Sequence, residues 1–476
     1  MTPLLPDKLP DTMPDALPNT IGELSALFRA RSLSPVEATR VCLERIAELN
    51  PRLNAFITVT ADAALAQAHQ AEAEILHGQW RGALHGVPIG LKDLIDTAGV
   101  RTTAGSAVYL DRVPAADAEL VRRLRLAGAV ILGKQNLHEF AYGGSSMVSC
   151  YGEVQNPWDT SRIAGGSSGG SAASVAAGLG YAAIGTDTAG SIRLPAACCG
   201  VVGLKPTYGR VSARGVIPLS RSLDHVGPIA RSVHDAALVL QAIAGYDSQD
   251  ATSRDAVTPD FSAELFAGAA SLRVGVLRSY FWDELDPEIR TATEHALATL
   301  AHLGAELLDL EVPVETSRTL QAAESYEFHA KSAAEHPELY QPETLRRIQS
   351  GAGITAAESS AARQQLERTR KEIGRVFERV DLLVTPTTPI LPPAIAELKN
   401  NPERLRPLEL TMLRNTRPFN VWGLPAVSIP CGFSSGGWPI GLQIAGPHWG
   451  EATVLRLAHA YESATAWHKR KPPLTL

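Results

Sequence analysis

The chain has 476 residues, of which 45% are hydrophobic and 20% are charged, and its net charge is -6. This composition is typical of a globular protein with a large core, and it excludes the disordered and fibrous classes. No cluster of lysines or arginines forms the basic stripe that binds a phosphate backbone, so we expect no nucleic-acid partner.

The first nineteen residues contain five prolines and scattered charges, without the apolar stretch of a signal peptide. We interpret residues 1–19 as a mobile arm. No apolar stretch reaches the roughly 18 residues that a membrane span requires. We therefore expect no membrane partner and a cytoplasmic location. The five cysteines lack paired CxxC spacing, which predicts reduced, buried thiols.

Two capping boxes begin the folded part, Thr20 with Glu23 and Ser34 with Glu37. They predict helices over 21–29 and 35–49, the second with proline at its first position. An alanine-rich stretch predicts a third helix over 61–77. The apolar stretch after it contains Lys92 and indicates a buried strand.

Helices and strands then alternate, which predicts an α/β sheet with helices on its faces. Helices are expected over 118–126, 287–303 and 451–465. Strands are expected over 129–132, 273–277, 381–385, 426–430 and 440–445. Residues 312–410 are polar, helical and irregular in pattern, and we expect them to form a wall of the substrate pocket.

The densest motif is a series of glycine- and serine-rich segments, residues 164–173, 185–195 and 199–206. Glycines at this density let the backbone adopt positive φ angles and approach a ligand closely. A phosphate-binding loop is a weak alternative, since neither GxxxxGK[ST] nor a complete GxGxxG pattern is present. A nucleophile elbow around Ser168 would need a downstream histidine, and His329, His448 and His459 lie in no distinctive loop.

These segments resemble the amidase signature family, as do residues 86–93, 156–159 and 423–433. The resemblance extends from Ile21 to the C-terminal helix. It implies one large α/β/α domain over residues 20–476, with a mixed, twisted central sheet covered by helices on both faces. It also implies three catalytic residues: Ser191 as nucleophile, Ser167 as a relay in a cis peptide, and Lys92 as base.

The chemistry of the residues agrees with that implication. A serine hydroxyl needs a base, and a neutral lysine can serve if burial lowers its pKa. Lys92 lies in an apolar stretch suited to burial. The alternative SxxK arrangement is absent, because none of the nine lysines has a serine three positions earlier. We predict no metal and no cofactor.

The resemblance also assigns an oxyanion hole and its surroundings. The hole would use the backbone N–H groups of Thr188, Ala189, Gly190 and Ser191. Ala189 departs from the usual pair of glycines, and a positive φ there would cost on the order of 1 kcal/mol. Asp187 and Arg193 are expected to brace this loop as a buried pair, with Ser168 and Thr186 in supporting roles. Substrate contacts are expected from Tyr142, Gly143, Gly144, Ser145, Ser146 and Met147.

We therefore expect a hydrolase that cleaves a small-molecule amide through a seryl acyl-enzyme, with aryl amides or carbamates among its substrates. One alternative is the glutaminase subunit of the tRNA-dependent amidotransferase, although residues 346–375 lack that subunit's tyrosine-rich helix. Another is a non-catalytic binding protein on the same scaffold. For the oligomeric state, a homodimer is one alternative.

Overall fold

The computed structural model describes residues 17–474 and is built around one mixed sheet of eleven strands. The strand order is β1-β3-β2-β6-β8-β7-β12-β13-β11-β9-β10. The strands of this sheet are β1 (Phe56–Val59), β2 (Pro88–Lys92), β3 (Val130–Gln135), β6 (Ala182–Asp187), β7 (Val202–Lys205), β8 (His225–Ala230), β9 (Arg273–Leu277), β10 (Glu306–Leu310), β11 (Leu382–Pro386), β12 (Ala426–Phe433) and β13 (Pro439–Ala445). A separate two-stranded sheet pairs β4 (Gln155–Asn156) with β5 (Asp159–Ile163).

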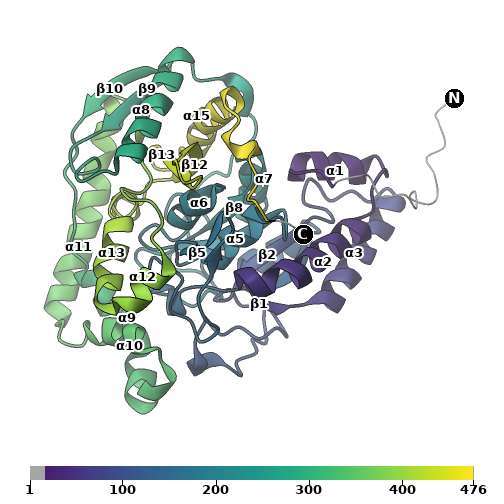
Figure 1. Ribbon diagram of the computed structural model, residues 1–476, viewed down its shortest axis with the longest axis horizontal. Helices are drawn as coiled ribbons and strands as arrows, with labels where there is room; N and C mark the ends of the chain where they lie inside the picture. Colours follow the sequence, from purple (N-terminus) through teal and green to yellow (C-terminus); the bar gives the residue numbers. More distant parts are fainter. Residues whose placement is uncertain (1–16, 475–476) are drawn as a thin grey trace.

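Helices cover both faces of the central sheet, as predicted for an α/β/α fold. They are α1 (Ile21–Arg29), α2 (Pro35–Leu53), α3 (Ala61–Leu76), α4 (Glu119–Leu126), α5 (Gly169–Ala176), α6 (Arg193–Cys199), α7 (Val233–Ile243), α8 (Pro287–His302), α9 (Thr319–Glu335), α10 (Pro342–Gln349), α11 (Ala356–Glu372), α12 (Ile395–Asn400), α13 (Leu405–Met412), α14 (Pro418–Val421) and α15 (Glu451–Ala464). Figure 1 shows α1–α3 at one end of the molecule and α8, β9 and β10 at the other.

Local sequence signals located α1, α2, α3, α4, α8 and α15, but they did not locate α9 and α11, which have 17 residues each. Both capping boxes form, with Thr20 capping α1 and Ser34 capping α2. Helix α2 extends four residues beyond the predicted end at Leu49 and terminates at Asn54, which adopts a left-handed conformation with φ of 52°. Pro51 lies inside this last turn. The helix therefore stops at the αL residue and not at the proline.

The sequence did not indicate five strands of the central sheet: β1, β6, β7, β8 and β10. Strand β6 reads Ala-Ala-Ile-Gly-Thr-Asp and is buried at every position. Small residues have low strand propensity, so the strand forms because its neighbours β2 and β8 pair with it on either side. The glycine-rich pattern in this part of the sequence comes from the loops that flank β6.

Residues 312–410 are mostly helical, with β11 as the strand among them. Helices α9, α10 and α11 pack against one another. The mobile arm predicted for residues 1–19 lies mostly outside the described residues, and the single-domain boundary at residue 20 stays a prediction.

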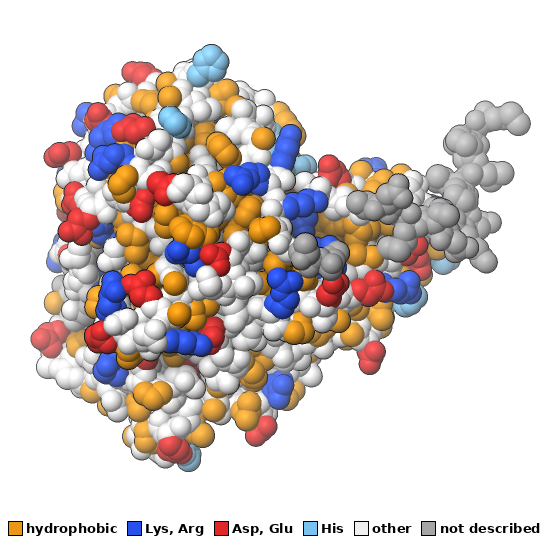
Figure 2. All heavy atoms as spheres, viewed as in Figure 1, with side chains coloured by type: hydrophobic (Ala, Val, Ile, Leu, Met, Phe, Trp, Pro, Cys, Tyr) orange, Lys and Arg blue, Asp and Glu red, His pale blue; other side chains and the backbone are white. Residues whose placement is uncertain are grey.

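The described surface is mixed in charge. Figure 2 shows basic and acidic side chains interspersed over one face, with apolar patches between them. Among residues 17–474, no helix is long and apolar enough to cross a membrane. All five cysteines are free, four of them buried and Cys150 partly exposed.

Candidate active site

The edge of the sheet where β2 and β6 end collects the predicted catalytic residues. These two strands are parallel neighbours, with Leu91 opposite Ile184. Their carboxyl ends therefore meet, which brings Lys92 beside Thr186 and Asp187. Ser167 lies in the turn before α5, and Ser191 lies in the turn that connects β6 to α6.

Lys92 is completely buried and makes two short polar contacts. Its Nζ lies 2.8 Å from Ser167 Oγ and 2.8 Å from Thr186 Oγ1. Burial lowers the pKa of Lys92 to about 7, against the opposing charges of Asp187 and Asp224. A substantial fraction of this amine is therefore neutral near pH 7, and its lone pair can then accept a proton from one of the two hydroxyl groups that it contacts.

Ser167 follows a cis peptide bond, Gly166–Ser167. Its carbonyl accepts hydrogen bonds from the Ser146 hydroxyl at 3.2 Å and from the His138 backbone N–H at 3.1 Å. A Cβ at Gly166 would lie 2.7 Å from the backbone nitrogen of Ser146, so only glycine fits there. These contacts fix the position of the Ser167 hydroxyl beside Lys92.

Ser191 is 3% exposed and lies beside the turn that contains Ser167. Its carbonyl accepts a hydrogen bond of 3.2 Å from the Ser168 backbone N–H. Within residues 17–474 its hydroxyl makes no hydrogen bond with Ser167 or any other residue. The structure thus brings Lys92 and Ser167 into direct contact, while the hydroxyl of Ser191 is left available for a ligand.

Asp187 organises the turn around Ser191. Its carboxylate accepts hydrogen bonds from the backbone N–H groups of Gly190 at 2.7 Å and Ile192 at 3.1 Å. Arg193 completes a buried pair, with Nε 3.0 Å from Asp187 Oδ2 and Nη2 2.9 Å from Oδ1. Burial alone would raise the pKa of Asp187, but Arg193 holds it well below its usual range. The charge on Asp187 is therefore kept.

The predicted oxyanion hole needs one correction. The N–H of Gly190 already donates to Asp187, because that carboxylate lies directly beneath the turn. It is therefore not free to bind an oxyanion. Within the described part of the chain, the N–H groups of Thr188, Ala189 and Ser191 have no hydrogen-bond acceptor.

Ala189 does not carry the strain that the sequence suggested. Among residues 17–474 it is not one of the residues with positive φ, whereas Gly190 has φ of 134°. Its side chain is buried in a small apolar cluster with Leu194 and Leu413. The turn needs glycine at one position only, so alanine fits at the other.

The loop over residues 142–147 adjoins this turn, but not all of it faces a ligand. Ser145 and Ser146 are fully buried. The Ser145 hydroxyl donates to Glu409 at 2.6 Å, and that of Ser146 bonds to the Ser167 carbonyl. Both serine hydroxyls are therefore used in contacts within the protein. The remaining candidates for substrate contact are Tyr142, Gly143, Gly144 and Met147.

The elbow alternative receives no support from the geometry. Ser168 is fully buried, and its hydroxyl donates to the Thr186 carbonyl at 3.2 Å. The three histidines considered for it have other partners. His329 contacts Tyr340, His448 contacts the Trp422 carbonyl, and His459 packs on Phe266.

Several residues around the turn were missed by sequence reasoning. Asn420 donates to the carbonyl and carboxylate of Asp187, each at 2.8 Å. Thr416 donates to the Ala189 carbonyl at 2.7 Å. Thr188 donates to Asp224 at 2.5 Å, and burial raises the pKa of Asp224 to about 6. Asn420 and Thr416 are more than 220 residues from the turn that they contact. No local spacing could have revealed them.

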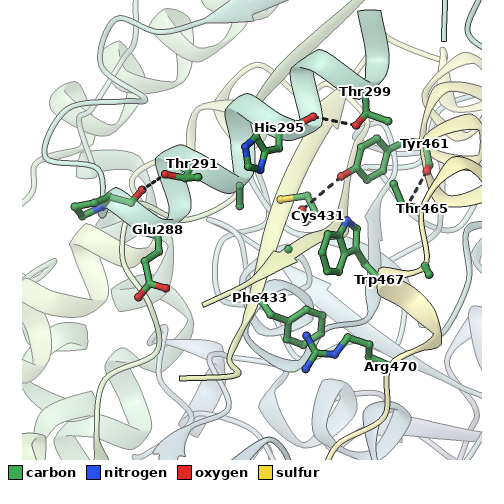
Figure 3. A pocket seen from close by; sticks show the side chains of 14 residues that line it. Glu288, Thr291, His295, Thr299, Cys431, Phe433, Tyr461, Thr465, Trp467 and Arg470 are labelled. Carbon is green, nitrogen blue, oxygen red and sulfur yellow. Dashed lines mark hydrogen bonds between the residues drawn. The ribbon is translucent and has the colours of Figure 1, made fainter. Parts of the chain in front are cut away.

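A separate groove of about 790 Å³ lies between α8, the end of β12 and the C-terminal turn η7 (Trp467–Lys469), and none of the predicted site residues lines it. Figure 3 shows its aromatic lining, where Arg470 stacks 3.7 Å from the Phe433 ring centroid. Burial raises the pKa of its Cys431 thiol, which keeps that sulfur protonated. Among the described residues, no group of three or more His, Cys, Asp or Glu could hold a metal ion.

A comparison with family models decides the family. The model described as Amidase matches residues 37–455, most of the chain. The chain is a member of the amidase family.

Within this family, known proteins of different function are similar to the chain. One is a subunit of the Glutamyl-tRNA(Gln) amidotransferase of Myxococcus xanthus, 43% identical over 484 residues that cover 96% of this chain and 99% of the relative. The peptide amidase of Stenotrophomonas maltophilia is 34% identical, with a TM-score of 0.82 over 96% of this chain and 98% of its own. The corresponding Glutamyl-tRNA(Gln) amidotransferase subunit of Thermotoga maritima is also 34% identical. Its TM-score is 0.73, over 92% of this chain and 95% of its own.

Proposed function

We propose that this amidase hydrolyses the C–N bond of a carboxamide through an ester on Ser191. The observation that carries the proposal is the contact of a buried lysine, whose pKa is about 7, with Ser167 in the turn beside Ser191. A desolvated amine can accept a proton near neutral pH, and a relay serine can pass it on. The geometry around Lys92 therefore supplies the base that a serine nucleophile requires.

In the first step, Ser191 Oγ attacks the carbonyl carbon of the amide. Its proton passes to Ser167 Oγ as the proton of Ser167 passes to Lys92 Nζ. The N–H groups of Thr188, Ala189 and Ser191 stabilise the negative oxygen of the tetrahedral intermediate. The C–N bond then breaks, the departing nitrogen takes a proton back through Ser167, and an ester remains on Ser191.

In the second step, water attacks the ester carbonyl and the same groups act again. Ser167 takes a proton from the water, the C–O bond to Ser191 breaks, and Ser191 recovers its proton. The products are a carboxylate and ammonia or an amine. Asp187 and Arg193 take no part in proton transfer in this scheme, and they hold the turn that carries the nucleophile.

The comparisons divide on the substrate. The curated relatives are named as a subunit of Glutamyl-tRNA(Gln) amidotransferase, and their 40 to 43% identity favours the glutaminase alternative over a small-molecule amidase. That assignment would bring partner subunits and a tRNA-bound product. The overall shape is more similar to the peptide amidase than to the Thermotoga maritima protein. Nothing in the comparisons favours the carbamate activity.

The amine released by the chain alone, ammonia from a primary amide or aniline from an anilide, distinguishes these candidates. Glutamine, a simple aliphatic amide and an anilide are each incubated with the wild-type protein and with Ser191→Ala. Hydrolysis of a simple amide by wild type alone, with a loss of at least about 10³-fold in Ser191→Ala, supports a self-sufficient amidase. Turnover of glutamine only, and only with partner subunits, would support the amidotransferase role. Activity of Ser191→Ala within tenfold of wild type would overturn the mechanism.

A further inference from the structure

A short loop over residues 219–224 is connected to the oxyanion hole by a carboxylate. The Thr188 hydroxyl donates a hydrogen bond of 2.5 Å to Oδ1 of Asp224, the last residue of this loop. The other oxygen of Asp224 accepts hydrogen bonds from the backbone N–H groups of Leu219 at 2.9 Å and Ser220 at 3.0 Å. One carboxylate therefore fixes both the shape of the loop and the position of Thr188.

A second carboxylate, from α9, holds the same loop. Glu324 Oε2 accepts hydrogen bonds from the Ser220 hydroxyl at 2.6 Å and the Ser222 backbone N–H at 3.1 Å. Glu324 Oε1 accepts a hydrogen bond of 2.5 Å from the Ser222 hydroxyl. The Glu324 side chain is only 6% exposed, so water competes little for these bonds. Both oxygens of Glu324 are therefore used to hold the loop.

The charge of Glu324 is compensated by an arginine of α11. Arg363 Nη2 lies 2.9 Å from Glu324 Oε1, and Arg363 Nη1 donates to the Ser222 hydroxyl at 3.1 Å. Further along α11, Arg370 Nη2 donates to the Ser222 carbonyl at 2.7 Å. A buried carboxylate is tolerated when it is paired and hydrogen-bonded in this way. Helices α9 and α11 therefore hold Ser222 together.

A small apolar cluster joins the same elements. It contains Leu223 of the loop, Leu320 of α9, Leu366 of α11 and Val421 of α14, all buried. This packing does not involve the Glu324 carboxylate. We therefore expect α9 and α11 to stay docked on the loop when that carboxylate is changed, so that its hydrogen bonds can be tested separately from the packing.

We propose that Glu324 is a positioning residue for the oxyanion hole and acts on Thr188 through the 219–224 loop. The hole stabilises a charge that develops only in the transition state. A small displacement of its N–H groups therefore lowers the rate without weakening the binding of the substrate. This inference rests on the proposed hydrolysis at Ser191, and it gives α9 and α11 a role in the chemistry.

The steady-state constants of Glu324→Gln test this role. Butyramide and acetanilide are the substrates. We expect kcat to fall about 10- to 100-fold, with KM within about threefold of wild type, because only transition-state stabilisation is lost. Glu327→Gln is the matched control, since Glu327 is an exposed carboxylate of the same helix, and it should change neither constant. A higher KM at constant kcat, or no change in either constant, would overturn the inference.

A double variant tests whether the effect passes through Thr188. Thr188→Val removes the hydroxyl that bonds to Asp224 and keeps the backbone N–H. If Glu324 acts through that bond, adding Glu324→Gln to Thr188→Val should lower kcat by no more than about threefold. If Glu324→Gln causes the same loss of kcat with and without the Thr188 hydroxyl, the two residues act independently and the inference is wrong.

Labelling of Ser191 by a fluorophosphonate gives a readout that needs no amide substrate. As Ser191 attacks phosphorus and displaces fluoride, the phosphoryl oxygen gains negative charge, which the same N–H groups stabilise. The second-order rate constant of labelling should fall about tenfold or more in Glu324→Gln and stay within twofold in Glu327→Gln. An unchanged rate constant in Glu324→Gln would contradict the positioning role.

Urea unfolding of each variant shows whether it folds. If Glu324→Gln does not fold, Ser220→Ala takes its place, because it removes one hydroxyl donor to Glu324 and leaves the carboxylate paired with Arg363. Ser220→Ala should lower the labelling rate constant about three- to tenfold. A folded Ser220→Ala protein with the labelling rate of wild type would then overturn the inference.

Failure of the inference can be separated from failure of the proposed function. If Ser191→Ala retains hydrolysis, or if the fluorophosphonate does not label Ser191, the proposed function fails. If hydrolysis and labelling both depend on Ser191 but are the same in wild type and Glu324→Gln, only the inference fails.

Discussion

At the scale of single residues, the environment of Lys92 determines whether this amine can act as the base. Three properties act together: complete burial, a contact of 2.8 Å with Ser167 and a contact of 2.8 Å with Thr186. Burial disfavours the charged form, so the base is neutral in a useful range of pH. Lys134 is also buried, and burial lowers its pKa to about 8, but it bonds to Thr102 and the Ile95 carbonyl. Location beside Ser167 therefore distinguishes the candidate base.

The pKa of Lys92 predicts the pH dependence of activity. The base must be neutral, and its pKa is lowered to about 7, so kcat/KM should rise with pH and level off above about 7. Below the pKa, the neutral fraction falls about tenfold for each pH unit. Rates measured from pH 5.5 to 9 give the midpoint. Asp224→Asn should move the midpoint to lower pH, because removal of a negative charge favours the neutral amine. A rate that is constant across this range or falls as pH rises would argue against Lys92.

The two small residues of the turn should respond differently to exchange. Gly190→Ala should lower kcat by about 10² or more, because φ is 134° and the new Cβ would collide with Thr416. Ala189→Gly should keep activity within about threefold and lower the free energy of unfolding by about 0.5 to 1 kcal/mol, through added freedom of the unfolded chain. Measurements of kcat and of urea unfolding for both variants test these two expectations. Equal effects on activity would contradict the assigned conformations.

At the scale of elements, the site is a turn between β6 and α6 that other elements support. Asp187 ends β6, Arg193 begins α6, and Asn420 of α14 contacts both of them. Sequence motifs predicted the Asp187–Arg193 bracing, because both residues lie within one glycine-rich segment. They could not indicate Asn420 or Thr416, since no periodicity connects residues that far apart. The sequence likewise did not decide whether Ala189 has a positive φ. The backbone angles show that, of the two neighbours, Gly190 has the positive φ and Ala189 does not.

Breaking the buried pair should destabilise the protein strongly. Arg193→Met leaves Asp187 as an uncompensated buried charge, and we expect a loss of about 3 to 5 kcal/mol in the free energy of unfolding. The double variant Asp187→Asn, Arg193→Met should recover a large part of that loss, because neither member of the pair is then charged. Urea denaturation of the single and double variants completes the cycle. If the losses of the two single changes simply add, the pair does not interact as described.

At the scale of the whole molecule, the central sheet joins segments that are far apart in the chain. The lysine and both serines lie before residue 192, yet β7 pairs with β12, and α14 and the segment before it support the turn around Ser191. The sequence pattern was enough to predict an α/β fold and several of its longer helices, although not α9 or α11. The strand order could not be predicted from it, because β12 and β13 insert between β7 and β11 by long-range pairing.

A truncated chain tests this dependence. A fragment that ends at residue 245 keeps Lys92, Ser167 and Ser191 but loses the strands that continue the sheet beyond β7. We expect it to lack cooperative unfolding and to have no measurable amidase activity, because β7 would expose an unpaired edge and Asp187 would lose Asn420. Circular dichroism and amide hydrolysis provide the readouts, with the full chain as reference. An active, cooperatively folded fragment would contradict the single-sheet account.

Covalent labelling tests the central claim, nucleophilic attack by Ser191, most directly. A fluorophosphonate reacts with an activated serine, and mass spectrometry of the digested protein locates the adduct. We predict one adduct, on the peptide that contains Ser191, with full labelling retained in Ser168→Ala and labelling lost in Ser191→Ala and strongly reduced in Lys92→Met. An adduct on Ser168, or no adduct on an otherwise folded wild-type protein, would contradict the account.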